Sequence, residues 1–314
     1  MSKDFFKVHM SGESGSPVYP IRGIVLLISV GLLWGINWPI MKVGMSSIPV
    51  FTFRTIAVFG GGLCLLAVCR YMGHSLKVPR SHWVPLFLVT GLIFGFQVFS
   101  GYGVLQTGSG RAAVMAYTMP VWAIPLGAIL LSEPITWRKA LSLMLGLGGM
   151  VLLLAADLQT LGAAPVGMLL MLITAILWAL ATIAQKKVAW TVPTMVLVAW
   201  QSLLGGIPLA IGAAIVDFNT VSFPGLWPIL ALIYNIFVAA AFCLYAYFEV
   251  VRIFPVGITT IGVMIAPVVG VFSGAALLGE PLGLFEYLAL ALVLAAIALP
   301  ITFNRDKPNK MINL

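Results

Sequence analysis

The sequence predicts an all-α membrane protein of about ten transmembrane helices, built from two inverted five-helix repeats, and three observations predict it. First, 61% of the 314 residues are hydrophobic, only 8% are charged, and the mean hydropathy is +1.10, whereas soluble domains usually carry about 25% charged residues. Second, about ten apolar runs are each long enough to cross a hydrocarbon core of about 30 Å. Third, one motif occurs twice, in residues 115–134 and 262–281.

The apolar runs mark the expected membrane spans. They cover roughly residues 23–42, 50–70, 83–103, 110–131, 139–156, 166–186, 193–214, 226–249, 256–278 and 284–303. None of them alternates apolar and polar residues, as the strands of a transmembrane barrel would. Many glycine, alanine and serine residues within the runs allow helices to pack closely in lipid. We therefore expect the helix bundle itself to be the core.

The repeated motif places a proline inside an apolar run and a Glu-Pro pair at its end. Glu133 follows Pro120 by 13 residues, and Glu280 follows Pro267 by the same 13 residues. The two copies are therefore offset by 147 residues. A proline inside a span removes a backbone hydrogen bond, so we expect both prolines to kink their helices and to act as hinges.

The repeat divides the chain into two units with opposite orientation. We expect a first five-helix repeat over residues 21–157, a second over 158–304 and a cytoplasmic tail over 305–314. Residues 1–20 are rich in Ser, Gly and Pro without apolar periodicity, which is typical of a disordered tail, here cytoplasmic. Because each repeat has an odd number of spans, the second must enter the membrane the other way round. Inverted repeats are typical of alternating-access carriers that bind substrate near the midplane.

The positive charges predict the topology. Cytoplasmic loops collect Lys and Arg, and with the N-terminus inside, only Lys42, Arg54 and Arg111 of the 17 cations fall on the outer side. We therefore predict a multi-pass protein of a bacterial inner (plasma) membrane with both termini cytoplasmic. The net charge of +8 reflects this bias and not a nucleic-acid partner, because no basic stretch is interleaved with exposed aromatic residues.

The motif pattern resembles that of a known transporter family. Each half contains a proline, an apolar run and Leu-Leu-(Ser/Gly)-Glu-Pro, followed by a span rich in glycine or alanine. Together with Trp-Gly-Ile-Asn-Trp-Pro at 34–39 and Gln-Thr-Gly-Ser-Gly-Arg-Ala-Ala at 106–113, this pattern is similar to the EamA-type ten-helix exporters of the drug/metabolite transporter superfamily. The resemblance covers about residues 22–303. It implies a basket-like bundle with a central cavity, and export of small metabolites or amino acids by facilitated diffusion or proton exchange.

Several side chains near the expected midplane are candidates for contact with a substrate. Buried polar groups in a membrane are costly unless they meet partners or a water-filled cavity, and aromatic groups beside them form a wall for a small zwitterion or polar metabolite. The predicted substrate-binding residues are Trp34, Asn37, Gln97, Tyr117, Trp178, Gln201 and Asn235. For each of them the alternative is packing or an interhelical hydrogen bond.

Two charged side chains carry alternatives of their own. Arg54 lies about one turn inside its span, so it contacts a substrate carboxylate, pairs with an acid such as Glu280, or snorkels to the interface. Glu133 precedes a proline, which is typical of a helix end, so we expect it to cap a helix or to pair with Arg138 or Lys139.

The sequence contains no recognisable reaction centre. It has no phosphate-binding loop, no clustered Ser/His/Asp set and no mid-span Asp or Glu that would serve as a proton or sodium relay. We expect no enzyme, no catalytic residue, no metal and no cofactor, and as partners a small-molecule substrate and the lipid bilayer. One duplicated chain completes a transport pathway, so a monomer suffices, and a dimer is also compatible.

These observations predict an inner-membrane carrier that exports small metabolites, such as amino acids or related compounds, by alternating access through a central cavity. The alternatives are an importer or exchanger of a nutrient or sugar derivative on the same scaffold, and a membrane protein that does not transport.

Overall fold

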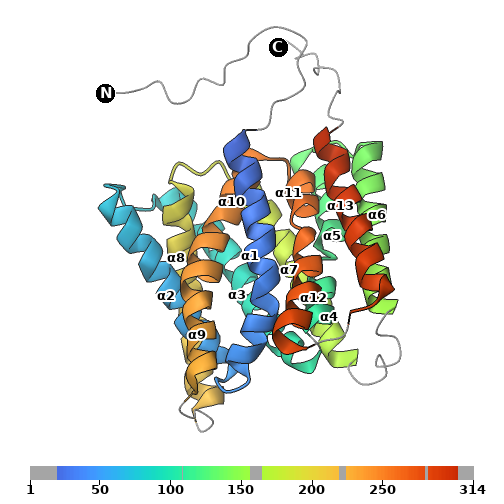
Figure 1. The fold of residues 1–314 in the computed structure, drawn as a ribbon. Coiled ribbons are helices and arrows are strands. Elements are labelled where there is room, and N and C mark those ends of the chain that lie inside the picture. Colours follow the sequence, from blue (N-terminus) through green and yellow to red (C-terminus); the bar gives the residue numbers. More distant parts are fainter. Residues whose placement is uncertain (1–19, 108, 156–164, 219–223, 280–281, 303–314) are drawn as a thin grey trace, which may run out of the picture.

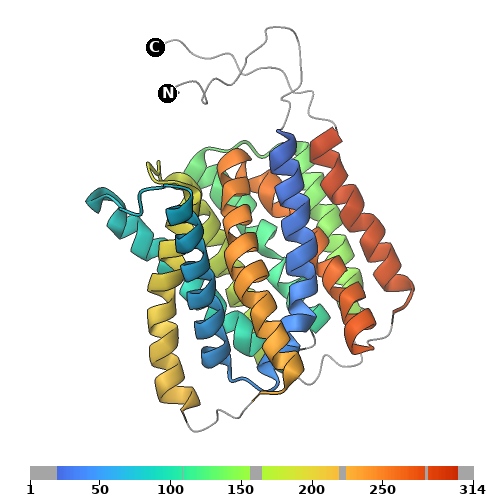
Figure 2. The ribbon, with the colours of Figure 1, turned by 60° about the vertical axis from the view of Figure 1, so that its left-hand side comes forward.

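Apolar runs of this length fold as helices because the backbone has no water in the bilayer and must satisfy its own hydrogen bonds. The computed structural model describes residues 20–107, 109–155, 165–218, 224–279 and 282–302. Figure 1 and, from another side, Figure 2 show their helices side by side in one bundle. The described residues contain no strand, so the predicted all-α class is confirmed. The predicted tails, 1–20 and 305–314, lie almost wholly outside the described residues.

The helices fall into two groups along the chain. The first group is α1 (Ile21–Met45), α2 (Val50–Tyr71), α3 (Trp83–Gln106), α4 (Ser109–Ala116), α5 (Met119–Leu131) and α6 (Trp137–Ala155). The second group is α7 (Pro165–Lys187), α8 (Thr194–Gly212), α9 (Leu226–Tyr234), α10 (Leu244–Ile253), α11 (Val256–Gly262), α12 (Ile265–Leu278) and α13 (Leu284–Thr302). A 3-10 turn, Arg80–His82, precedes α3, and two π-helical stretches, Ala213–Asp217 and Asn235–Cys243, continue α8 and join α9 to α10.

Within the described residues, eight helical stretches are long and apolar enough to cross a membrane, and they match eight of the ten expected spans. They are Ile21–Met45, Val50–Tyr71, Arg80–Gln106, Ala112–Leu131, Val166–Lys187, Thr194–Asp217, Leu226–Ile253 and Val256–Leu278. The helices α6 and α13, of 19 residues each, occupy the remaining two ranges. The count of ten spans stays a prediction.

The outer surface of the bundle is apolar. Aliphatic side chains such as Val84, Ile129 and Met144 are 80%, 76% and 67% exposed, which suits a surface that faces lipid. Three exposed tryptophans, Trp83, Trp137 and Trp227, stand at helix starts, where the membrane–water interface favours amphipathic rings. The apolar core and the apolar outer surface together fit the predicted membrane protein.

Neighbouring helices often come from opposite groups. The helix α1 packs against α12, α2 against α8, α3 against α7, and α6 against α13. Glycines allow these backbones to approach closely: a Cβ on Gly35 of α1 would lie 2.8 Å from the carbonyl oxygen of Ala266 in α12. Because small residues drive helix association in lipid, this interleaving joins the two groups into one bundle.

Two spans are broken near the middle, at the positions that the repeated prolines predict. The pair α4 and α5 is interrupted at residues 117–118, and the pair α11 and α12 at residues 263–264. Pro120 and Pro267 lie just after these breaks and deprive the carbonyl four residues earlier of its donor. In Figure 1, α4 lies below α5 whereas α11 lies above α12, so the broken spans run in opposite directions.

Both broken spans also end in the same way. The residue after α5, Ser132, has φ 54°, and the residue after α12, Gly279, has φ 69°, so both are left-handed helix caps. They are separated by the same 147 residues as the prolines. The left-handed conformation costs about 1–2 kcal/mol for a residue with a Cβ, so the serine carries strain that the glycine avoids.

Exchanging these two caps has opposite expected effects. Ser132→Gly is expected to raise the free energy of unfolding by about 1 kcal/mol, and Gly279→Ser to lower it by about 1 kcal/mol. Among the described residues no atom lies within 4 Å of a Cβ built on Gly279, so the backbone conformation alone decides the outcome. Thermal unfolding of the detergent-solubilised variants measures both effects, and shifts of the same sign would contradict this interpretation.

Candidate functional site

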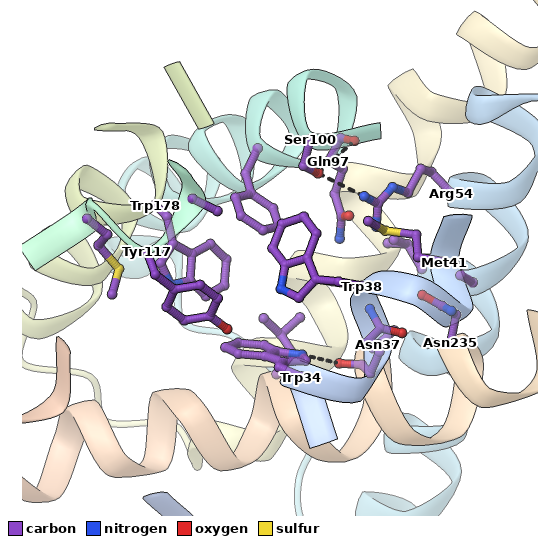
Figure 3. A pocket seen from close by; sticks show the side chains of 18 residues that line it. Trp34, Asn37, Trp38, Met41, Arg54, Gln97, Ser100, Tyr117, Trp178 and Asn235 are labelled. Carbon is purple, nitrogen blue, oxygen red and sulfur yellow. Dashed lines mark hydrogen bonds between the residues drawn. The ribbon is translucent and has the colours of Figure 1, made fainter. Parts of the chain in front are cut away.

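A pocket lies where helices of the two groups meet. Side chains from α1, α2, α3, the break between α4 and α5, α7, the π-helical stretch and α10 line it. Its cavity volume is about 80 Å³, several times the roughly 10–15 Å³ that one water needs. It therefore has room for a small polar ligand, and Figure 3 shows its lining.

Six of the seven residues predicted to bind substrate line this pocket. They are Trp34, Asn37, Gln97, Tyr117, Trp178 and Asn235. Gln201 does not line it: this side chain is fully buried, and its Nε2 donates to Oε1 of Gln185 at 2.8 Å. Depth in the membrane was its only sequence signal, and depth does not show which side of α8 faces the pocket.

One side of the pocket is an aromatic wall. The ring of Trp178 lies 5.4 Å from that of Trp34 and 4.5 Å from that of Phe96, between centroids. The rings of Trp38 and Tyr117 stand edge to face at 6.4 Å. Such contacts fix the rings in place, so the wall is preorganised to receive an apolar group.

The π-helical stretch Asn235–Cys243 supplies the floor of the pocket. In a π-helix the backbone hydrogen bonds join residues five apart instead of four, and such stretches often occur at functional sites. Here the carbonyl of Ala239 accepts a hydrogen bond from Nε1 of Trp34 at 3.3 Å, and Oη of Tyr234 donates to the carbonyl of Leu33 at 2.9 Å. These two bonds tie α1 to the second group directly beside the pocket.

The opposite side of the pocket is polar. Oδ1 of Asn37 and Oε1 of Gln97 are buried without a hydrogen-bond partner among the described residues. Asn235 differs, because its Nδ2 donates to the carbonyl of Ala231 in its own helix at 3.0 Å. Buried polar atoms are normally paired, so these two amide oxygens are acceptors that the described residues leave unsatisfied beside the pocket.

Arg54, for which the sequence left contact with a substrate carboxylate open, also lines the pocket. Other lining residues were not among the candidates, and they include Trp38, Met41, Phe96, Ser100 and Met119. A helical period of 3.6 residues places Ser100 on the same face as Gln97, and Met41 on the same face as Trp38. Helical spacing from the predicted residues could therefore have pointed to Ser100 and Met41. Their side-chain chemistry alone did not distinguish them from packing residues.

The described lining of the pocket consists of aromatic and aliphatic side chains, amides, hydroxyls and one guanidinium. Its described lining residues include no Asp, Glu or His, and the described part of the chain contains no group of His, Cys, Asp or Glu that would hold a metal ion. The chemistry of the lining is therefore that of recognition: rings, amides, hydroxyls and one guanidinium.

A polar contact closes one end of the bundle, next to the left-handed cap of α5. The backbone N–H groups of Val256 and Gly257, at the start of α11, donate to the carboxylate of Glu133 at 2.8 and 3.4 Å. Nζ of Lys139 lies 3.7 Å from the same carboxylate. The sequence left open whether Glu133 caps a helix or pairs with Arg138 or Lys139; in the structure it does both, with Lys139 as the cation, and the capped helix belongs to the other group.

Comparison with known proteins gives consistent results. The sequence model of the EamA-like transporter family matches residues 21–155 and 165–302. The "Uncharacterized transporter YoaV" of Bacillus subtilis is 25% identical over 297 residues, which cover 91% of this chain and 99% of that protein. The "Uncharacterized inner membrane transporter YedA" of Escherichia coli is 25% identical over 283 residues, which cover 87% of this chain and 88% of that protein.

Two further matches extend the comparison. The "Probable amino-acid metabolite efflux pump" of Salmonella typhimurium is 27% identical over 291 residues, which cover 87% of this chain and 92% of that protein. A solved protein crystal structure superposes on this chain with a TM-score of 0.77 at 21% sequence identity. The match covers 90% of this chain and 97% of the other one. At this identity the structural match supports the fold alone.

A first prediction concerns the close approach of α2 to the floor of the pocket. A Cβ on Gly61 would lie 2.7 Å from Cβ of Ala240 and 3.0 Å from its carbonyl carbon. Gly61→Ala must therefore displace the π-helical backbone, and we expect a lower melting temperature together with impaired transport. The matched control is Gly91→Ala, which meets no described atom within 4 Å and is expected to gain up to about 1 kcal/mol of helix propensity. Equal effects of the two substitutions would contradict the close packing.

A second prediction separates two glutamines by the same substitution. Gln201→Leu removes the bond to Gln185 and leaves a buried acceptor unpaired, so we expect a loss of about 1–3 kcal/mol of stability. Gln97→Leu replaces an amide whose oxygen is already unpaired in the pocket, so we expect stability to change by less than about 1 kcal/mol and transport to fall. Melting temperature and transport rate, measured on both variants, test this. A stability loss in Gln97→Leu as large as that in Gln201→Leu would contradict the assignment.

Proposed function

Because this chain belongs to the EamA-like transporter family, we propose that it is a carrier that exports small metabolites, such as amino acids or related compounds, by alternating access through the central pocket. The observation that carries this function is the position of the pocket between the two stretches that the family model matches. A site at the junction of two halves is reached from either side when the halves move against each other. The lining of rings and amides suits a small polar molecule with an apolar part.

The carrier consists of two inverted repeats of five spans, residues 21–157 and 158–304, with α6 and α13 as their fifth spans. Three observations support this: the matched breaks and caps at an offset of 147 residues, their opposite direction in Figure 1, and the pairing of helices between the groups. Exchanging the conformations of two such repeats gives inward-open and outward-open states of similar energy. One chain completes the pathway, so a monomer suffices.

The protein lies in a bacterial inner membrane with both termini cytoplasmic. The Lys and Arg bias of the sequence supports this orientation, as does the name of the inner-membrane relative YedA. In Figure 1 the start of α1 and the end of α13 lie at the same end of the bundle. With this orientation, the contact between Glu133 and the start of α11 closes the cytoplasmic end, and it must open during transport.

A neighbouring contact supports the same closed end. Nζ of Lys186, at the end of α7, donates to the carbonyls of Val251, Arg252 and Phe254 at 2.7, 3.3 and 2.9 Å. These carbonyls lie at the end of α10, where the helix dipole favours a cation. Lys42, the counterpart of Lys186 in the first repeat, makes no such bond to the described residues, so the two ends of the bundle differ in this state.

A counterflow screen in proteoliposomes tests the function. The vesicles are loaded in turn with amino acids, sugars and cationic drugs, without an imposed proton gradient. We expect exchange of amino acids or related compounds. Efflux from preloaded cells that express the protein then separates export from the alternative, import or exchange of a nutrient or sugar derivative. No exchange of any compound by folded protein would overturn the proposed function.

Two tryptophan variants test whether the substrate passes through the pocket during exchange. Trp34→Ala removes a ring of the aromatic wall and the bond to the carbonyl of Ala239, so we expect exchange to fall by at least about tenfold. Trp227→Ala is the matched control, because this ring is 72% exposed and does not line the pocket. Unchanged exchange by folded Trp34→Ala would show that the substrate takes another path.

A further inference from the structure

Arg54 is a buried cation inside the membrane bundle. It is the fifth residue of α2, its side chain is 6% exposed, and it lines the pocket. A charged side chain at such a site is costly unless it is paired or faces a cavity. Snorkelling to the interface does not describe it, because a snorkelling guanidinium ends in water or among headgroups.

No ion pair joins Arg54 to a carboxylate of the described residues. The described ion pairs of acidic side chains join Glu133 to Lys139, and Glu249 to Arg22 and Arg252. The ion pair with Glu280 that the sequence left open involves a residue outside the described ones. Among the described residues that line the pocket, Arg54 carries the sole charge, so the pocket has a positive potential that attracts an anionic group.

The guanidinium is held in place but is far from fully bonded. Its Nη2 donates to Oγ of Ser100 at 2.8 Å, and this hydroxyl donates in turn to the carbonyl of Gln97 at 3.3 Å. Nε of Arg54 is buried without a partner among the described residues. A guanidinium has five N–H donors in a planar fork that matches a carboxylate. Most of these donors therefore remain available, in a group whose position is already set.

The surroundings of Arg54 match the rest of a small ligand. Figure 3 shows Arg54, Gln97 and Ser100 together at one end of the pocket, and Tyr117 and Trp178 at the other. Asn37 and Gln97 line the same pocket, and their amide oxygens are buried acceptors without a partner among the described residues, which suit an N–H donor. The aromatic wall suits an apolar or aromatic body.

We propose that Arg54, positioned by Ser100, binds a carboxylate of the transported substrate, and that the substrate is an amino acid with an apolar or aromatic side chain. This inference rests on the proposed function and names the chemistry of its ligand. The carboxylate neutralises the buried guanidinium, the amino group donates to the amide oxygens of Asn37 and Gln97, and the side chain packs on the rings. A ligand of this kind satisfies each of the unpaired groups that line the pocket.

The test compares three probes by counterflow in proteoliposomes: L-phenylalanine, phenylpropionate, which lacks the amino group, and phenethylamine, which lacks the carboxylate. The wild-type protein is expected to exchange both carboxylates and not the amine. In Arg54→Gln, exchange of L-phenylalanine is expected to fall by about 10- to 100-fold, the range for a lost hydrogen bond to a charged group. The matched control is Arg70→Gln, which removes an exposed arginine from the end of the same helix and is expected to leave exchange unchanged.

Arg54→Lys keeps the test open if Arg54→Gln does not fold. Lysine retains the charge but not the planar fork, so a folded Arg54→Lys protein is expected to exchange L-phenylalanine about tenfold more slowly than the wild type. Exchange of phenethylamine as fast as L-phenylalanine, or normal exchange of L-phenylalanine by folded Arg54→Gln, would overturn the inference and leave the proposed function standing. Exchange of sugars or cationic drugs in place of the carboxylates would do the same. Absence of exchange of every compound by folded wild-type protein overturns both.

Discussion

The need to satisfy every backbone hydrogen bond without water shapes this molecule. In the bilayer the helix meets that need, and an interruption exposes carbonyl or N–H groups that must find other partners. Two interruptions meet at the central pocket: the break after α4, near Pro120, and the π-helical stretch that begins at Asn235. One carbonyl of that stretch, that of Ala239, accepts its bond from Trp34. The irregular backbone is thus located where it borders a cavity rather than lipid.

The second interruption of a proline-bearing span serves packing instead. Met264, at the break between α11 and α12, is fully buried, and its methyl carbon occupies the space beside Gly146 of α6, 2.2 Å from where a Cβ would lie. The counterpart break, at Tyr117, opens onto the pocket. Two segments related by the repeat therefore have different surroundings in one state of the protein. An alternating-access carrier has this property, because its two halves adopt unlike conformations at any one moment.

The cost of burying polar groups away from water also explains where the charged side chains of this bundle lie. Among the described acidic side chains, Glu133 caps α11, Asp217 accepts from the backbone N–H of Thr52 near the start of α2, and Glu249 pairs with Arg252, their Oε2 and Nε atoms 3.1 Å apart. Arg54 alone brings a charge to the described lining of the pocket. The pocket thus combines a preorganised apolar wall with a cation that has no ion pair among the described residues. Such a pocket selects a ligand by the charge at one of its ends and by the shape of the other.

The sequence by itself determined the all-α class, eight of the spans, the duplicated motif with its prolines, and the transporter family, because hydropathy and fixed spacing are local properties that every helix in lipid must express. It also identified side chains such as Trp34 and Asn37 by their depth. Only the tertiary structure decided that Trp34 and Trp178 touch, that Gln201 pairs with Gln185 away from the pocket, and that Arg54 faces inward. Depth follows from position along a span, but the direction in which a side chain points depends on the rotation of each helix against its neighbours, and that rotation is set by packing contacts between distant parts of the chain.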